Sequence, residues 1–218
     1  MIWDWNFAIS IIPFLLSGLW VTVQVTFFGI IIAMVVGLVV AVVRFARIPV
    51  LSRIFDFLVQ FVRGTPLLIQ AYCAFFILPA YGLSFSPLVT GTVVIGLNYS
   101  AYTAEVYRSG IQDVPAGQWE AATALNLPAG VTWRRIVLPQ AVRSVIPALG
   151  NYLVQMFKDS AVLSAITVFE LLAHAQSIGS SSYRYIEPLT IAGLLFLVVS
   201  IVSAQIIQRT DRRHALTR

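Results

Sequence analysis

A few ionisable and hydrogen-bonding residues lie within or near long apolar stretches of this sequence, where such groups are uncommon. Lys158 and Asp159 stand near the end of one stretch, and Asn98 and Tyr102 stand four residues apart in another. Because residues four apart share one face of a helix, Asn98 and Tyr102 could hydrogen-bond a polar solute or, equally, a neighbouring helix. Asp159 could attract a cationic group and Lys158 a carboxylate, or both side chains could extend to an aqueous interface.

A second group, Arg63-Gly64-Thr65-Pro66, predicts an interruption in a helix. Pro66 lacks a backbone N–H and clashes with the carbonyl group of Val62, which kinks a helix. The Thr65 hydroxyl can satisfy the carbonyl groups that the kink sets free. The kink could serve as a hinge or as a fixed bend.

The remaining titratable residues form no catalytic or metal-binding pattern. Glu105 stands three residues before Arg108, which favours a structural ion pair, and neither His174 nor His214 has a second His or Cys at helical spacing. The sequence has no nucleophile–base–acid set that water could reach and no GxxxxGK[ST] phosphate loop. The single Cys73 is expected to be a small core residue. We therefore expect neither an enzyme nor a cofactor bound to this chain.

Composition places these residues in an all-α membrane protein. The 218 residues are 59% hydrophobic and 11% charged, with a mean hydropathy of +0.87. A soluble domain is about half apolar and about a quarter charged, so much of this chain is expected to face membrane lipid. The net charge of +5 does not suggest a nucleic-acid partner, because no soluble basic face is expected.

A membrane-spanning helix needs about 20 mostly apolar residues, and five such segments are predicted within a single membrane domain over residues 1–218. The first is longer than needed and is expected to begin at the interface, around Trp3, Trp5 and Phe7. No cleavable signal peptide is expected, because residues 1–5 contain no Lys or Arg and the first apolar run is too long. The predicted spans are Ile11–Val43, Ile54–Leu78, Pro87–Val106, Val142–Leu163 and Pro188–Ile207.

The basic residues indicate how these spans are oriented. Most of the 14 Lys and Arg residues fall in alternate connections and in the C-terminal tail, whereas Arg184 stands alone on the opposite side. Lys and Arg are enriched on the cytoplasmic side of membrane proteins, which predicts an N-terminus outside and a cytoplasmic C-terminus. The residues on the predicted cytoplasmic side are Arg44, Arg47, Arg53, Arg108, Arg134, Arg135, Arg143, Arg209, Arg212, Arg213 and Arg218.

Small residues recur every fourth position in the first span, at Gly29, Ala33, Gly37 and Ala41. On a helix this series forms one smooth stripe, which a second helix can approach closely. The partner helix could belong to the same chain or to another subunit.

The predicted cytoplasmic loop, about residues 109–142, contains signals for two short surface helices. The first covers Ala116–Leu125, and Asn126 can take the left-handed position that follows it. The second covers Pro128–Val137 and is expected to end at Pro139. The apolar residues expected to anchor this hairpin are Trp119, Trp133 and Ile136.

Four motifs stand in order along the chain. They are Phe61-Val62-Arg63-Gly64-Thr65-Pro66-Leu67-Leu68, then Tyr102–Ile111, then Gly117-Gln118-Trp119-Glu120-Ala121-Ala122 with Ile136-Val137-Leu138-Pro139, and finally Lys158-Asp159-Ser160-Ala161-Val162-Leu163-Ser164. The third resembles the EAA loop of permease subunits in ATP-binding cassette importers, and the others resemble the RGTP, pre-loop and KDS/T segments of the polar amino acid permeases. One position departs, because Asn126 stands where the family usually has Gly; Asn also tolerates the left-handed region.

This resemblance implies a MetI-like permease fold in the bacterial inner membrane and the import of a polar amino acid or similar zwitterion. It implies three kinds of partner: a cytoplasmic ATP-binding cassette ATPase dimer, a second permease subunit of the same or a similar kind, and a substrate-binding protein. It also favours Asp159 as part of the translocation path. The residues that it assigns to ATPase coupling are Gly117, Glu120, Ala121, Ala122, Asn126, Leu138 and Pro139.

Two other functions remain open at this point, a membrane anchor without a path of its own and a symporter driven by a solute gradient. The tyrosines Tyr72, Tyr99 and Tyr102 would suit a cationic or quaternary-ammonium-like solute through cation–π contact. Compatible solutes such as ectoine therefore stand beside amino acids as expected substrates.

Overall fold

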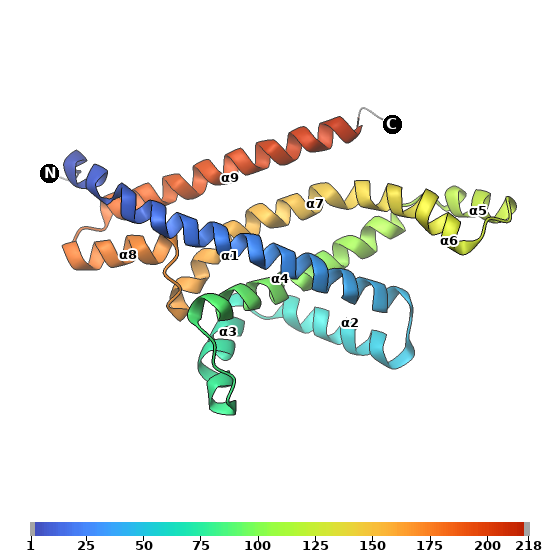
Figure 1. Ribbon diagram of the computed structural model, residues 1–218, viewed down its shortest axis with the longest axis horizontal. Coiled ribbons are helices and arrows are strands. Elements are labelled where there is room, and N and C mark those ends of the chain that lie inside the picture. Colours follow the sequence, from blue (N-terminus) through green and yellow to red (C-terminus); the bar gives the residue numbers. More distant parts are fainter. Residues whose placement is uncertain (1–2, 216–218) are drawn as a thin grey trace.

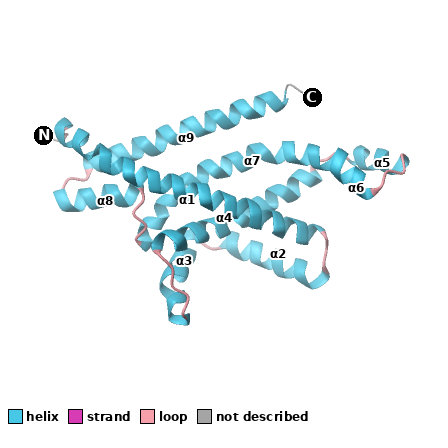
Figure 2. Cartoon of the chain, in the orientation of Figure 1, coloured by secondary structure: helices cyan, strands magenta, loops and turns pink. Residues whose placement is uncertain are grey.

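The computed structural model describes residues 3–215, with side chains described for residues 3–209, and this part of the chain is helical without a strand. The predicted all-α fold is confirmed. Figures 1 and 2 show long helices that run beside one another along the molecule, joined by short connections. Arg212, Arg213, His214 and Arg218 lie outside the described side chains. The helices are α1 (Trp5–Phe45), α2 (Pro49–Gly64), α3 (Leu67–Tyr72), α4 (Pro87–Gln112), α5 (Ala116–Ala124), α6 (Ala129–Thr132), α7 (Leu138–Asp159), α8 (Leu171–Ser182) and α9 (Ile186–Ala215).

Helix α1 runs for 41 residues and is the longest helix of the bundle. Asp4 caps its first turn, since its carboxylate accepts hydrogen bonds from the backbone N–H groups of Asn6 and Phe7 at 2.9 and 3.2 Å. At a rise of about 1.5 Å per residue, α1 is roughly 60 Å long, about twice the thickness of a membrane's hydrocarbon core. The predicted interfacial segment around Trp5 and Phe7 is therefore continuous with the first span.

The small-residue stripe of α1 packs against α4 of the same chain. All four stripe residues are buried. A Cβ atom added at Gly37 would lie 2.0 Å from Oγ1 of Thr103, so only glycine fits there. The Thr103 hydroxyl also donates a hydrogen bond of 2.7 Å to the carbonyl oxygen of Ala33. The alternative that the sequence left open is thus decided in favour of a partner within the chain.

Within the described residues, two helices, α1 and the Ile186–Arg209 part of α9, are long and apolar enough to cross a membrane, and two bent pairs raise the number to as many as four. The third predicted span, α4, does not reach the same apolarity although it has 26 residues. The reason is that α4 buries polar side chains such as Asn98 and Ser100 inside the bundle. A helix surrounded by protein does not need the apolar surface that lipid demands.

The second predicted span, Ile54–Leu78, is broken at Arg63-Gly64-Thr65-Pro66, as the sequence predicts. Helix α2 ends at Gly64, and the chain turns by 106° before the segment Leu67–Tyr81, which joins α3 to a π-helical turn and a 3-10 turn. Figure 1 shows this segment leaving the side of the bundle. The prediction of Cys73 as a core residue is wrong, because Cys73 lies on this projecting segment and is exposed.

The prediction that a helix ends at Pro139 is wrong as well. A π-helical turn over Trp133–Val137 joins α6 directly to α7, and Pro139 lies at the start of α7. The backbone N–H of Leu138 bonds the carbonyl oxygen of Trp133, so the wider turn shifts the hydrogen-bond pattern just before the proline, which has no N–H to give.

The predicted connection between the last two spans contains a helix that the sequence reading missed. Helix α8 begins after Glu170, whose side chain accepts hydrogen bonds from the backbone N–H groups of Leu172 and Ala173 at 2.9 and 2.8 Å. His174 lies in α8, and α8 packs against α1 and α9.

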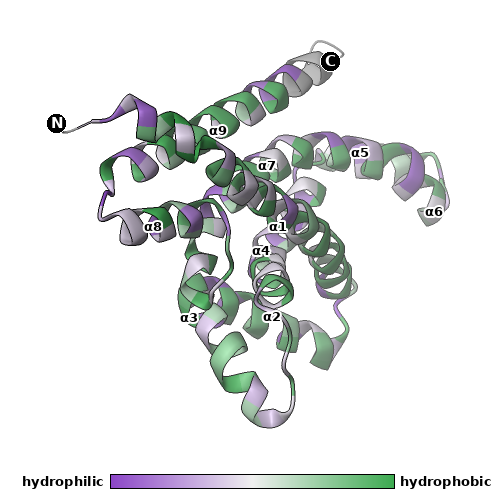
Figure 3. Cartoon of the chain, turned by 60° about the vertical axis from the view of Figure 1, so that its left-hand side comes forward, coloured by the Kyte–Doolittle hydropathy of each residue, from purple (hydrophilic) through white to green (hydrophobic). Residues whose placement is uncertain are grey.

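Chain segments that are rich in arginine gather at one end of the molecule. Figure 1 places the α1–α2 turn, helices α5 and α6 and the end of α9 at one end, and the start of α1, α8 and the α8–α9 connection at the other. Figure 3 shows hydrophobic residues along most of the helices, with hydrophilic residues near the start of α1, on α8 and around α5. This arrangement agrees with the distribution on which the predicted orientation depends; the orientation itself stays a prediction.

Candidate functional site

A pocket of about 300 Å³ lies between the α2–α3 break, α4 and α7. It brings together Asn98, Tyr102 and Asp159, three of the four residues predicted for a solute path. All four residues of the predicted break line it too. The complete lining is Arg63, Gly64, Thr65, Pro66, Leu67, Asn98, Tyr99, Tyr102, Tyr152, Gln155 and Asp159.

The break itself is built from extended backbone at Thr65 and Pro66, with ψ angles of 140° and 135°. The Thr65 hydroxyl donates to the carbonyl oxygen of Phe61 at 2.9 Å, as the sequence predicted for the groups that the proline sets free. The side chain of Gln70, on α3, reaches back across the break to the end of α2. Gln70 was not singled out in the sequence.

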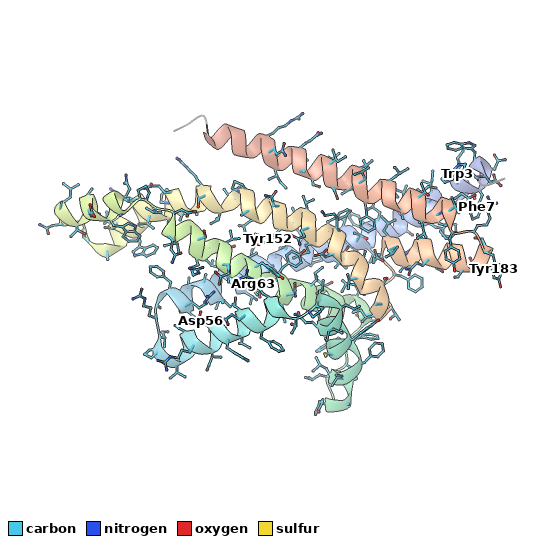
Figure 4. All side chains as sticks on the ribbon, turned by 180° about the vertical axis from the view of Figure 1, so that it is seen from behind. Trp3, Phe7, Asp56, Arg63, Tyr152 and Tyr183 are labelled. Atoms are coloured by element: carbon cyan, nitrogen blue, oxygen red, sulfur yellow. The ribbon has the colours of Figure 1, made fainter. Side chains whose placement is uncertain are left out.

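Three tyrosines form the aromatic wall of the pocket. The rings of Tyr99, Tyr102 and Tyr152 lie 5.7 to 6.0 Å apart, centre to centre. The guanidinium group of Arg63 lies 5.5 Å from the centre of the Tyr102 ring, within cation–π distance. Figure 4 shows Arg63 on α2 and Tyr152 on α7 in the middle of the molecule.

The pocket holds one cation and one anion that do not pair with each other. Neither Arg63 nor Asp159 has an ion-pair partner within 4.0 Å among the described side chains. Asp159 instead accepts a hydrogen bond of 2.6 Å from the hydroxyl of Tyr99, a buried side chain. Each charge therefore has a neutral aromatic neighbour and no ion-pair partner among the described side chains.

Two residues expected near the solute lie elsewhere. Lys158 is exposed and does not line the pocket, because adjacent residues on a helix point about 100° apart. Tyr72 lies on α3, beside Phe76 at 5.7 Å between ring centres, and away from the other tyrosines. The turn at the helix break explains the position of Tyr72.

A network of four charged residues lies nearer the end of the molecule where the segments rich in arginine gather. Glu105 pairs with Arg108 at 2.7 Å, as its spacing predicts, and also with Arg44 at 2.7 Å. Arg44 in turn pairs with Asp56 at 2.6 Å. This network joins α1, α2 and α4. Its contacts to Arg44 and Asp56 have no local signal in the sequence, because these two residues are far from Glu105 in the chain.

The predicted cytoplasmic loop, about residues 109–142, is held by aromatic packing. Trp133 lies edge-on to both Trp119 and Phe45, with ring centres 5.4 and 5.1 Å apart. Helix α5 ends at Ala124, and the φ of 50° at Asn126, just beyond it, confirms the predicted left-handed conformation. The N–H of Leu127 bonds the carbonyl oxygen of Ala122 at 3.0 Å, which completes a Schellman turn.

The surface of this loop is open. Gly117, Glu120 and Ala121 are exposed, whereas Ala122 is buried beneath them. A Cβ atom at Gly117 would meet nothing within 4 Å. The two final residues assigned to coupling, Leu138 and Pro139, begin α7 and are also exposed. Movement of the loop would thus pass directly into α7, which carries Tyr152 and Asp159.

At the opposite end, Arg184 joins the start of α1 to the start of α9. It pairs with Asp4 at 3.2 Å and with Glu187, and its guanidinium lies 4.6 Å from the centre of the Phe7 ring. Backbone N–H donation from Phe7, followed by the bond from Arg184, lowers the pKa of the Asp4 carboxyl below its ordinary value. Figure 4 shows Phe7 and Trp3 at this end.

No group of three or more His, Cys, Asp or Glu residues suited to a metal ion occurs in the described part of the chain. The helical bundle, with a polar pocket inside it and an exposed loop at one end, defines a membrane transport subunit. Residues 29–214 match the family of binding-protein-dependent transport system inner membrane components. The chain belongs to this family. It is therefore a permease subunit of the inner membrane, not an enzyme, and its transport system draws on a separate ATPase subunit and a substrate-binding protein.

Relatives over nearly the full length agree with this family. The chain is 44% identical over 205 residues to a probable amino-acid ABC transporter permease protein y4tG of Sinorhizobium fredii (strain NBRC 101917 / NGR234), covering 94% of this chain and 89% of that protein. It is 33% identical to the arginine transport system permease protein ArtQ of Bacillus subtilis (strain 168), with 96% of each covered.

Solved structures share the fold. The chain superposes on a crystal structure of an amino acid ABC transporter with histidines at a TM-score of 0.94 and 32% identity, covering 98% of this chain and 100% of that one. It also matches an inward-facing MetNI methionine ABC transporter at a TM-score of 0.79 and 21% identity, covering 94% of this chain and 97% of that one. The second likeness supports the MetI-like fold alone.

Proposed function

We propose that this permease passes a polar amino acid, or a similar zwitterionic solute such as ectoine, through the pocket between α2, α4 and α7. One observation carries the proposal: Arg63 and Asp159 line the same pocket, and each lacks an ion-pair partner among the described side chains. A solute that carries one positive and one negative group complements both charges. The names of the relatives, which include amino-acid, arginine and L-cystine permeases, support this class.

The exposed loop is the proposed contact with a cytoplasmic ATPase dimer. In this proposal, Glu120 and its exposed neighbours Gly117, Ala121 and Asn126 lie in a groove of the ATPase, and the buried Ala122 supports them from beneath. Leu138 and Pro139 carry the movement of the loop into α7. The N-terminus lies outside the cell and the C-terminus inside, since segments rich in arginine favour the cytoplasmic side.

The α2–α3 break is the proposed hinge of this movement. Arg63, Gly64, Thr65 and Pro66 form both the break and one wall of the pocket, so a change in the angle between α2 and α3 would change access to the solute. A second permease subunit, identical or similar, would complete the path, and a substrate-binding protein would deliver the solute. ATP binding shifts the equilibrium because the ATPase contacts differ between the two states.

The test uses the complex of permease, ATPase and binding protein reconstituted in proteoliposomes with ATP on the ATPase side. Glu120→Lys is expected to abolish ATP-driven uptake while the permease still assembles in the membrane. Asp113→Lys is the matched control, because it makes the same charge change at an exposed position outside α5. Normal uptake by Glu120→Lys would contradict the coupling role.

The same preparation separates the two alternatives. A symporter would accumulate solute without ATP when an ion gradient is applied. A membrane anchor would assemble with its partners, and Asp159→Asn would leave uptake unchanged. The proposed permease requires ATP and loses uptake with Asp159→Asn.

A further inference from the structure

The side chain of Gln70 has a fixed orientation. Its Nε2 atom lies 2.9 Å from the carbonyl oxygen of Val62, 3.2 Å from that of Thr65 and 2.7 Å from the Thr65 hydroxyl oxygen. Carbonyl oxygens only accept hydrogen bonds, so the amide nitrogen of Gln70 must face them. The end of α2 therefore determines which way this amide points.

This orientation passes on to Asn98 in the pocket wall. The Oε1 atom of Gln70 lies 3.1 Å from the Nδ2 atom of Asn98. Because Oε1 can only accept, Asn98 must turn its NH₂ group toward Gln70 and its Oδ1 atom away. Asn98 lines the pocket with 5% of its surface exposed.

The Oδ1 atom of Asn98 is left free for a solute. No hydrogen bond to it occurs among the described residues, yet it is not one of the buried side-chain atoms that lack a partner. It therefore keeps contact with the open space of the pocket, which also contains Asp159 and Arg63.

We propose that Gln70 is a positioning residue that makes Asn98 a hydrogen-bond acceptor toward the solute. The solute's nitrogen, bearing at least one N–H, then lies near Asn98 and Asp159, and its carboxylate lies toward Arg63. This rests on the proposed function and narrows its substrate class to zwitterions with an N–H donor, such as primary amino acids or ectoine. Fully methylated ammonium compounds such as glycine betaine lack that donor.

The test measures direct binding to the purified permease–ATPase complex without the binding protein, so that the binding protein's own preference does not enter. The probes are labelled L-glutamine, L-arginine, L-cystine, ectoine and glycine betaine. The proposal expects glycine betaine to bind more weakly than the best N–H-bearing probe. If wild type binds none of these probes, the proposed function fails; if glycine betaine binds best, the inference alone fails.

Two substitutions then separate positioning from simple bracing of the helix break. Gln70→Met removes the bond that orients Asn98 and is expected to weaken binding of the best probe about tenfold. Gln60→Met is the matched control, on an exposed position of α2, and should leave the dissociation constant unchanged. Basal ATPase activity and the yield of assembled complex show that each variant folds.

Rescue is the decisive result. Asn98→Asp presents acceptor oxygens on both sides and needs no orienting partner, so in the Gln70→Met background it should restore binding to within about threefold of wild type. With Gln70 present, Asn98→Asp should not increase the affinity for the probe, because the new carboxylate faces the Oε1 atom of Gln70. Failure to rescue, or an equal gain in both backgrounds, would overturn the proposal.

A second comparison applies if Gln70→Met does not assemble. Asn98→Asp and Asn98→Leu both remove the donor to Gln70, but only Asp offers an acceptor to the solute. The proposal requires Asn98→Leu to bind about tenfold more weakly than Asn98→Asp. Equal binding by the two variants would overturn it.

Discussion

The charged network at the end of α4 and the pocket beside the middle of α4 both contain arginine and carboxylate side chains, but only the network pairs them. Glu105 bonds two arginines at 2.7 Å each, whereas Asp159 bonds the neutral hydroxyl of Tyr99. A paired charge is satisfied by the fold and holds helices together. A charge held by neutral groups keeps part of its electrostatic attraction for a ligand, and we propose that this difference separates structural from functional ionisable residues in this permease.

The largest expected effect comes from breaking the network. Glu105→Ala leaves Arg44 and Arg108 without a shared carboxylate, and removing one partner of a buried pair is strongly destabilising. Because the Glu105 side chain is 20% exposed, we expect a loss of about 2 kcal/mol in unfolding free energy, below the range for fully buried pairs. The measurement is denaturant unfolding of the purified permease in detergent.

Solute binding by Glu105→Ala should stay within about twofold of wild type at a temperature where the variant remains folded. A large loss of solute affinity in the folded variant would show that the network also contributes to solute binding. That result would contradict the distinction between the network and the pocket.

A smaller effect is expected from the pocket cation. Arg63→Gln keeps a long polar side chain but removes the charge proposed to meet the solute's carboxylate. We expect the dissociation constant to rise about tenfold, or about 1.4 kcal/mol, with little change in unfolding free energy. Arg53→Gln, at an exposed position of the same helix, is the control, and equal losses in both variants would contradict a specific role for Arg63.

The smallest effect concerns the ion pair between Asp4 and Arg184, at the end of the bundle where α1 begins. The pKa of Asp4 is lowered in the folded chain by its bonds to Phe7 and Arg184, so this carboxylate stabilises the fold above its unfolded pKa of about 3.9. That contribution is lost as pH falls through the lower, folded pKa. We expect the melting temperature of wild type to fall slightly more than that of Asp4→Asn between pH 5 and pH 2. Parallel curves would show that Asp4 is not stabilised by its pairing.

Local features of the chain could be predicted from the sequence, and long-range ones could not. The left-handed Asn126, the Glu105–Arg108 pair and the closely packed Gly37 each depend on residues near them or on one helix face. The partners Arg44 and Gln70 could not be found, because only the folded chain brings them to Glu105 and Asn98.

The remaining differences have separate physical causes. Pro66 predicts an interruption within Ile54–Leu78, but the 106° turn there could not be predicted, because the apolar length of a segment carries no information on its direction. That turn also exposes Cys73 and separates Tyr72 from the pocket. Proline was treated as a helix end at Pro139, but the preceding π-helical turn accommodates it.

We propose that the unpaired carboxylate of the pocket, Asp159, binds the solute, whereas the paired carboxylates of the network stabilise the fold. The most direct measurement compares Asp159→Asn with Asp56→Asn in ATP-driven uptake by proteoliposomes with equal amounts of assembled complex. Both changes remove one negative charge, and Asp56 pairs with Arg44 in the network. We expect at least a tenfold loss of uptake for Asp159→Asn, about 1.4 kcal/mol, and near wild-type uptake for Asp56→Asn. Equal uptake by the two variants would contradict this proposal.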